Sequence, residues 1–268
     1  IAQCLVGSEM CIRDSVNTEA IQVERGAKSG VATILVKQST GERAVFFERS
    51  TATEPEFLDT HKQLIGSAYI LHINGRHRQL MRSAMAVAKE VGTIISLDGG
   101  AQRYDEDMKP ITEASHIVIV ARDYAEKYTG TTNLKEACRI IHERGACIAG
   151  VTDGANGSYF VWPDGTFYRC EPFTQSTVVD TTGAGDSFHG AFLANLVHTI
   201  NHMKGQDTTS TTKHDRASIH AVELLKACAH SDLEKAAIFA SAVASLNTQG
   251  IGGRSPLPTL KSVQELIG

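Results

Sequence analysis

The segment most suited to chemistry runs from Asp180 to Asp186 and reads DTTGAGD. It leads directly into SFHGAFLANLV, whose apolar residues recur at helical spacing, so the pattern predicts a helix that begins here. Small residues before a helix leave backbone N–H groups unshielded, and the helix N-terminus adds partial positive charge. The segment is therefore expected to bind an anion, phosphate above all.

Asp186 would stand beside this anion site, placed to accept a proton from an attacking hydroxyl. A carboxylate at a helix start is commonly a cap, and that role would account for Asp186 alone. It would not account for Gly183, Ala184 and Gly185 in front of it. We therefore expect these three residues to supply an anion hole and Asp186 to act as the base.

Two other phosphate-binding loops do not fit the spacing. No GxxxxGK[ST] sequence occurs, so a P-loop enzyme is excluded. The GAG triplet is followed by Asp-Ser-Phe where a dinucleotide fingerprint requires a third glycine, which disfavours a Rossmann-type oxidoreductase.

The DTTGAGD segment resembles the C-terminal signature of the PfkB (ribokinase-like) family of carbohydrate kinases. In that family the GAGD segment forms the anion hole, and its Asp deprotonates the sugar hydroxyl that attacks the γ-phosphate of ATP. The resemblance implies ATP and Mg²⁺ as cofactors. In many members the first Asp and its loop also hold a monovalent cation, so Asp180 and the Thr182 carbonyl would bind K⁺ here. Asp180 could equally be a turn-capping residue.

Two further segments resemble the family's nucleotide-binding elements. VTDGANGS at 151–158 lies where the family has a glycine turn over the phosphates, so Thr152, Gly154 and Gly157 are expected near ATP. A glycine turn after a strand is common in any fold. ASAVASLNTQGIGGR resembles the helix and loop around the adenine, with Asn247 the expected contact, although its alanines also suit close helix packing.

A third segment concerns the substrate. LHINGRH at 71–77 resembles segments of the ketohexokinase and sulfofructose kinase branch, so Asn74 and Arg76 are expected to contact the sugar. The planar fork of an arginine suits a phosphate or sulfonate. The alternative is that Arg76 merely forms a surface ion pair. The family's NxxE motif for Mg²⁺-bound water is replaced by Ala121 and Tyr124, as in that branch, which leaves the Mg²⁺ ligands unassigned.

Strand and helix patterns alternate along the rest of the chain, which argues for a mostly parallel sheet covered by helices. With the resemblance, this predicts a ribokinase-like α/β fold with part of a small β lid. Strands are expected at 68–73, 93–98, 116–120, 147–152, 158–162 and 166–170, and helices at 78–91, 134–144, 219–228 and 233–246. Residues 30–48 read as two lid strands around a turn at 39–41, although a hairpin of the central sheet fits almost as well.

The ends and one internal tract stand apart from the kinase pattern. Residues 1–15 read as a non-native leader, which leaves 16–268 as a PfkB domain. The family's initial strand and sugar-binding motif are not found, so the domain is expected to lack its first third. Residues 201–218 are polar and rich in Ser and Thr, and we interpret them as an insertion.

Composition narrows the class of protein. The chain has 268 residues, 42% of them hydrophobic, a net charge of −4 and six cysteines without a CxxC pair. No basic field favours nucleic acid, and no apolar run approaches the roughly 20 residues that span a bilayer. A cytoplasmic protein is expected. Its expected partners are ATP, a small sugar, and a second copy bound through the lid.

The sequence therefore predicts a kinase that transfers the ATP γ-phosphate to a hydroxymethyl group of a ketose or sugar derivative. A ribose or nucleoside kinase of the same family is the first alternative. The second is a catalytically silent nucleotide-binding protein.

Overall fold

The computed structural model describes residues 17–268 except 19, 37–42, 176, 207–220 and 254–255. Its centre is a sheet of six strands in the order β3-β4-β5-β6-β7-β8. The strands from β3 to β6 are parallel, and β7 and β8 continue the sheet antiparallel. Their bounds are Ile70–Ile73 (β3), Ile94–Gly99 (β4), Ile117–Ala121 (β5), Ile148–Thr152 (β6), Ser158–Val161 (β7) and Phe167–Cys170 (β8).

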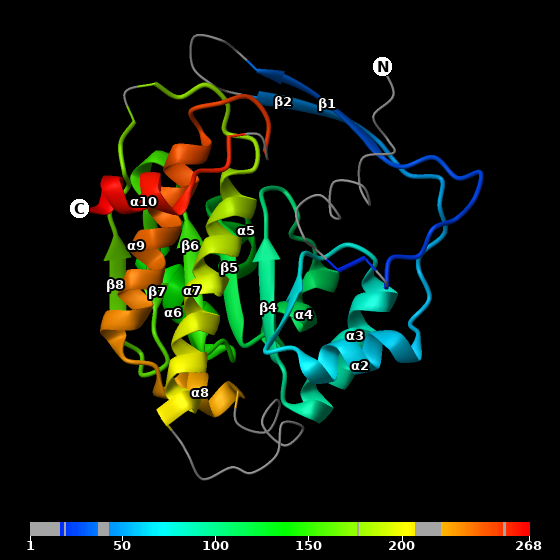
Figure 1. The fold of residues 1–268 in the computed structure, drawn as a ribbon, viewed down its shortest axis with the longest axis horizontal. Helices are drawn as coiled ribbons and strands as arrows, with labels where there is room; N and C mark the ends of the chain where they lie inside the picture. The colour runs from blue at the N-terminus through cyan, green and yellow to red at the C-terminus, as the bar shows by residue number, and fades with distance from the viewer. Residues whose placement is uncertain (1–16, 19, 37–42, 176, 207–220, 254–255) are drawn as a thin grey trace.

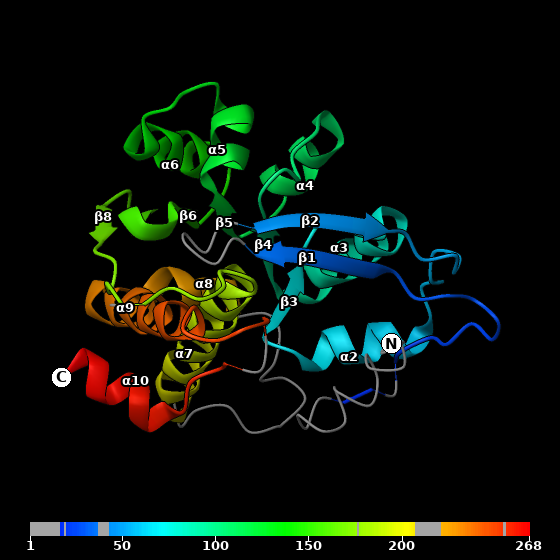
Figure 2. The same ribbon diagram turned by 90° about the horizontal axis from the view of Figure 1, so that it is seen from above.

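Helices cover both faces of this sheet, which gives three layers (Figures 1 and 2). One face carries α3 (Arg78–Val91), α5 (Arg122–Thr129) and α6 (Leu134–Glu143), with α2 (Asp59–Ser67) packed beside α3 and the short α4 (Lys109–Glu113) nearby. The other face carries α7 (Ala184–Gln206), α8 (Ala221–Ala227), α9 (His230–Asn247) and α10 (Leu260–Ile267). Two short 3₁₀ turns, η1 (Glu106–Met108) and η2 (Gly154–Asn156), follow β4 and β6. This is the ribokinase-like α/β architecture that the sequence predicts.

Alternate residues of the strands enter two separate cores. In β5, Val118 and Val120 pack toward α3 and α5, whereas Ile117 and Ile119 pack toward α7 and α9. Strands buried on both faces need apolar residues at nearly every position, which explains the continuous runs of Ile and Val. The pattern changes near the end of β4, where Asp98 occupies the α7-facing side.

A separate two-stranded antiparallel sheet forms the lid. It consists of β1 (Val31–Val36) and β2 (Arg43–Glu48). Both views place this sheet across the carboxyl ends of β3 and β4 (Figures 1 and 2). The alternative of a hairpin within the central sheet is therefore wrong. The expected turn at 39–41 lies outside the described residues.

Some elements differ from the sequence prediction. Helices α2, α4, α5 and α10 were not expected. Helix α7 extends to Gln206, so the first six residues of the polar tract at 201–218 are helical, and 207–218 lie outside the described residues. The leader predicted at 1–15 also lies outside them. Within the described part of the chain, no helix is long and apolar enough to cross a membrane.

Candidate active site

The first turn of α7 presents backbone amides at its start. The first helical hydrogen bond runs from the Ser187 amide to the Gly183 carbonyl at 2.8 Å. The amides of Gly185 and Asp186 precede it and so have no intrahelical acceptor. The Ala184 amide donates to the Thr181 carbonyl at 3.3 Å, so one of the three expected anion-hole amides takes part in a turn. Asp186 itself is exposed.

The loop before α7 is fixed by a buried carboxylate. Asp180 accepts hydrogen bonds from the Thr182 amide at 2.8 Å and from the Gly252 amide at 2.9 Å. Gly183 has φ +78° and lies against Gly253, where an added Cβ would come within 2.4 Å of the Gly253 Cα. Only glycine combines that backbone conformation with that approach. The sequence of this loop therefore determines the shape of the helix start.

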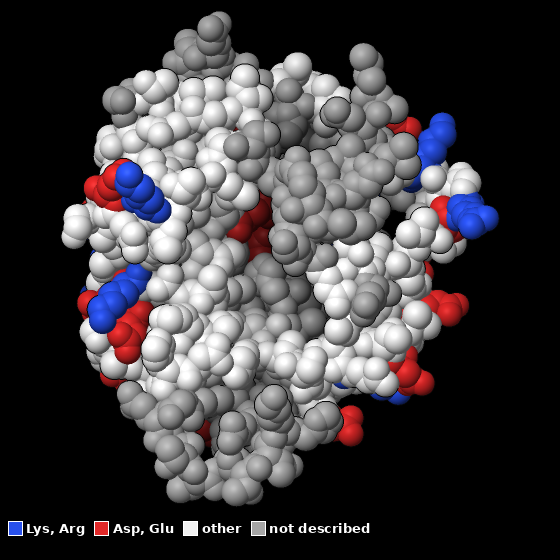
Figure 3. Space-filling model, viewed as in Figure 1, with Lys and Arg blue, Asp and Glu red and all other residues white. Residues whose placement is uncertain are grey.

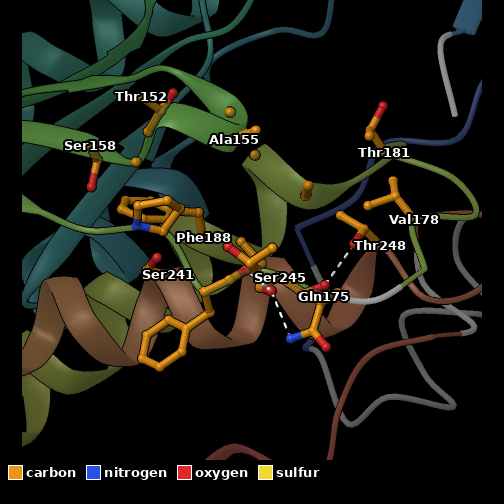
Figure 4. A pocket seen from close by; sticks show the side chains of 18 residues that line it. Thr152, Ala155, Ser158, Gln175, Val178, Thr181, Phe188, Ser241, Ser245 and Thr248 are labelled. Atoms are coloured by element: carbon orange, nitrogen blue, oxygen red, sulfur yellow. Dashed lines mark hydrogen bonds between the residues drawn. The ribbon is translucent and has the colours of Figure 1, made fainter. Parts of the chain in front are cut away.

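A cavity of ≈ 440 Å³ opens beside this turn. Thr152, Gly154 and Gly157, from the end of β6 and the turn after it, line one side. Ala184 and Gly185 line another, so five of the residues that the motifs single out share one cavity (Figure 4). A third wall comes from Ser241, Ala244 and Ser245 of α9 and from Thr248, which follows the helix.

Part of this cavity could not be read from the sequence. The irregular segment between β8 and α7 contributes Phe173 and Gln175. The side-chain Nε2 of Gln175 donates to the Ser245 hydroxyl at 2.9 Å (Figure 4). That hydroxyl donates to the Phe173 carbonyl at 2.6 Å. No motif marks these residues, because their place depends on how the loop crosses α9.

Asn247 differs from its expected role as an adenine contact. Its side chain is fully buried and does not line the cavity. The Nδ2 atom donates to the Thr182 carbonyl at 3.2 Å. Asn247 is the last residue of α9, and the turn of the helix directs it toward the loop rather than the cavity. Through this hydrogen bond, Asn247 supports the loop that leads into α7.

The other side of the α7 turn faces a polar region at the ends of β3 and β4. Asp98 accepts from Nε2 of His189 at 3.3 Å and from Nη1 of Arg103 at 3.2 Å. Burial alone would raise the pKa of Asp98, but the hydrogen bond and charge of His189 and the charge of Arg103 lower it on balance. Figure 3 shows acidic side chains deep in the central hollow of this face. Asp186 itself borders a second hollow, of ≈ 670 Å³, between α7, α9 and the segment before α10.

The loop after β3 carries the predicted substrate residues. The Arg76 amide donates to the Asn74 side chain at 3.2 Å, and the exposed Arg76 guanidinium lies over the Phe47 ring of the lid strand β2, 5.2 Å from its centroid. Among the described residues, Arg78 at the start of α3 and Arg103 in the loop after β4 have carboxylate partners, whereas Arg76 has none. The surface ion pair considered for Arg76 is therefore not formed with any described residue.

Backbone strain gathers in the same loops. Of the described residues other than glycine, two have positive φ: His77 after β3, at 50°, and Gln102 after β4, at 60°. Such conformations cost free energy and are concentrated at functional sites. The Gln102 amide donates to Asp123. Both strained residues among those described therefore lie in the loops that follow β3 and β4.

The described residues include no group of three His, Cys, Asp or Glu side chains that could hold a metal ion. Tyr124, at the position of the family's motif glutamate, is fully buried and shares a hydrogen bond with Thr112 at 2.7 Å. His198 and His202 have HxxxH spacing, and their Nε2 atoms lie 3.0 Å apart on the exposed side of α7, which provides two ligands. A protein-only Mg²⁺ site does not fit these residues.

The family profile described as pfkB family carbohydrate kinase matches residues 9–260. The chain belongs to this family. Probable fructokinase-5 of Arabidopsis thaliana is 26% identical over 273 residues, which covers 95% of this chain and 76% of the relative. The chain spans 60% of the length of several other fructokinases that it matches.

Solved structures show the same fold. Ribokinase from Giardia lamblia matches with a TM-score of 0.75 at 17% identity, over 97% of this chain and 77% of that one. Fructokinase from Vibrio cholerae O395, in a form with fructose, ADP and calcium ion bound, matches with a TM-score of 0.70 at 17% identity, over 97% and 80%. For this pfkB family chain, these likenesses establish the ribokinase-like fold.

Proposed function

We propose that this protein transfers the γ-phosphate of ATP to a hydroxymethyl group of a ketose or sugar derivative, with Asp186 as the base. ATP would occupy the ≈ 440 Å³ cavity, with its phosphates directed at the start of α7. The open amides of Gly185 and Asp186 would stabilise the charge on the transferring phosphoryl group. The observation that carries the proposal is that Ala184 and Gly185, which line this cavity, share the first turn of α7 with Asp186.

Mg²⁺ would arrive with the nucleotide. Because the described residues offer no carboxylate cluster, phosphate oxygens and water would supply most of its ligands, as Mg²⁺ commonly accepts. Its chemistry would be to offset charge on the β- and γ-phosphates. The protein's own contribution is the placement of the amides and of the Asp186 carboxylate.

The test compares Asp186→Ala with Asp232→Ala. Both acids lie in the first turn of a helix, but Asp232 belongs to α9 and pairs with Lys235. We expect Asp186→Ala to abolish sugar phosphorylation while ADP binding, measured by calorimetry, persists. Asp232→Ala should keep its turnover. Turnover near the original rate in Asp186→Ala would remove this residue from the mechanism.

We further propose that the preferred sugar carries an acidic group, held by Arg76. The guanidinium is exposed, has no carboxylate partner among the described residues, and is oriented by Phe47 of the lid. Arg76→Gln should raise KM for a phosphorylated or sulfonated ketose far more than for the neutral ketose. The exposed Arg82 on α3 provides the control, Arg82→Gln. Equal effects on acidic and neutral sugars would contradict an anion contact.

The loop at Asp180 suits a monovalent cation. Thr182 Oγ1 and Asn247 Oδ1 are buried without hydrogen-bond partners among the described residues, and the two side chains belong to the same loop–helix contact. Buried oxygen atoms without a hydrogen-bond donor are available as ligands for a cation such as K⁺. If Asp180 and Thr182 hold K⁺, replacing K⁺ with Li⁺ at equal ionic strength should lower the melting temperature of the protein without substrate.

We propose that a second copy of the protein binds through the lid. Its exposed apolar side chains are Val31, Leu35, Phe46 and Phe47. Exposed apolar groups gathered on one small sheet mark an association surface. Sedimentation analysis should give a dimer, and Leu35→Lys should shift it to monomer.

The ribose and nucleoside alternative is tested by the same sugar panel. A protein that binds ADP but phosphorylates no acceptor would favour the silent nucleotide-binding alternative.

A further inference from the structure

The α7-facing side of the central sheet is polar where it passes Asp186. In β5 and β6 this side is apolar, with Ile117, Ile119 and Ile148 in the core. Ser96 of β4 pairs in register with Ile117, and Asp98 pairs with Ile119, so both lie on the same side as those isoleucines. An apolar core would tolerate these polar residues only at a cost unless they have partners.

The partner of Asp98 is on α7. His189 lies three residues after Asp186, almost one helical turn further, and its Nε2 is 3.3 Å from the Asp98 Oδ1. A carboxylate can only accept, so Nε2 carries the proton of this contact. The His189 side chain is 6% exposed, and Nδ1 is buried without a partner among the described residues. The contact with Asp98 is therefore the hydrogen bond that holds the ring.

Other charged and polar groups complete the surroundings. On β3, Nδ1 of His72 is 3.2 Å from the Ser96 hydroxyl, and its ring lies 5.4 Å from the His189 ring. Arg103, in the loop after β4, holds the second oxygen of Asp98. Desolvation and the charge of His189 lower the pKa of His72, whereas the charges of Asp98 and Asp186 pull it upward. Asp186 thus lies within electrostatic reach of this network.

We propose that the His189–Asp98 pair is a positioning device for Asp186. It attaches α7, one turn beyond Asp186, to the carboxyl end of β4, and so aims the Asp186 carboxylate at the acceptor hydroxyl. The apolar residues of the same helix, Phe188 and Phe192, stack with Phe160 of β7 and hold the opposite flank. His189 and Asp98 are positioning residues, because they act through the placement of Asp186. This inference rests on the proposed function.

The test uses His189→Leu, His189→Gln and His198→Leu. Leucine removes the donor, whereas the Nε2 of glutamine can still donate to Asp98. His198 is on the exposed side of the same helix and serves as the control. A displacement of about 1 Å at a reacting group costs on the order of 100-fold in rate. We expect His189→Leu to lower kcat about 10- to 100-fold with KM for ATP unchanged. His189→Gln should recover most of kcat, and His198→Leu should not change it.

Several outcomes would overturn the proposal. An unchanged kcat in His189→Leu, an equal loss in His189→Gln, or a matching rise in KM for ATP would each do so. If His189→Leu does not fold, His189→Asn replaces it, because asparagine is polar but too short to reach Asp98. The proposal then requires a higher kcat in the glutamine variant than in the asparagine variant.

A second measurement separates this inference from the proposed function. The ¹³C carboxyl signal of Asp186 is assigned by its absence in Asp186→Ala, and its chemical shift is recorded at one fixed pH. His189→Leu should move that signal, because the carboxylate changes its surroundings, and His198→Leu should leave it in place. If His189→Leu moves the signal but the unaltered protein phosphorylates no sugar, the proposed function is wrong and the positioning role of His189 stands. If the unaltered protein phosphorylates a sugar but the signal does not move, the positioning role is wrong and the proposed function stands.

Discussion

The side chain of Asn247 donates a hydrogen bond to the carbonyl oxygen of Thr182 at 3.2 Å, and so joins the last residue of α9 to the loop before α7. The two residues are far apart in the sequence; Asn247 is buried, and Thr182 is half-buried. Because this carbonyl belongs to the loop that shapes the helix start, the shape of the site depends on an interaction across the fold.

Replacing Asn247 with leucine should weaken this connection. The variant keeps the side-chain volume but leaves the Thr182 carbonyl without its donor, which typically costs about 1–3 kcal/mol. We expect a loss of that size in the free energy of unfolding by urea, together with a lower kcat. The exposed Gln264 of α10 supplies the control, Gln264→Leu, which should alter neither quantity. An unaffected Asn247→Leu would show that the loop is held by other contacts.

Gly183 and Gly190 form a matched pair of glycines at α7. An alanine at Gly183 would need φ +78° and would bring its Cβ within 2.6 Å of the Gly253 carbonyl oxygen, so the loop must move. At Gly190 nothing lies within 4 Å, and alanine favours a helix by about 1 kcal/mol over glycine. We expect Gly183→Ala to lower stability and activity, and Gly190→Ala to raise the melting temperature. A tolerated Gly183→Ala would contradict the close contact.

A larger side chain at Ala244 should fill the proposed nucleotide cavity. Ala244 lines that cavity from α9, whereas Ala227 ends α8 and is exposed. Because binding sites bury most of a ligand's surface, Ala244→Phe should weaken ADP binding at least about tenfold. Ala227→Phe should bind ADP like the original protein. Calorimetric titration measures both, and unchanged ADP affinity in Ala244→Phe would place the nucleotide elsewhere.

Stability should fall as the pH is lowered, because the pKa values of His72 and Asp98 are both lower than their ordinary 6.5 and 3.8. A lowered pKa means that the native state binds fewer protons than the unfolded state, so stability rises with pH. The contribution of His72 is lost as pH falls from about 6.5 through its folded-state pKa, and that of Asp98 at more acidic pH. His72→Gln should therefore reduce the loss of stability between about pH 6.5 and the folded-state pKa of His72.

Asp98→Asn tests the second part of this pH dependence. At neutral pH the variant should be less stable than the original protein, since His189 and Arg103 lose a charged partner. The difference should narrow as the pH falls below 3.8 and Asp98 becomes protonated. Urea unfolding at a series of pH values measures it. A difference that stays constant with pH would mean that Asp98 contributes by shape alone.

Several elements followed from local sequence. The helix Arg78–Val91 was predicted with its observed bounds, because Met81, Ala84, Met85 and Ala88 repeat at helical spacing. The strands β4, β5 and β6 agree within one residue at each end, since their apolar runs need burial on both faces. Helix α5 was not expected. It contains four charged residues among its eight and buries only Tyr124, Ala125 and Tyr128, which gives a weak pattern.

The sequence by itself determined the chemistry at the start of α7. Two glycines, an alanine and an acid before an amphipathic helix specify open amides next to a carboxylate, because these properties are local to the backbone. The tertiary structure decided what surrounds them. It placed Asn247 against the Thr182 carbonyl and outside the lining of the ≈ 440 Å³ cavity, and brought Gln175 onto α9. It also set Asp98 against His189, since contacts between distant segments arise only when the sheet and its helices pack together.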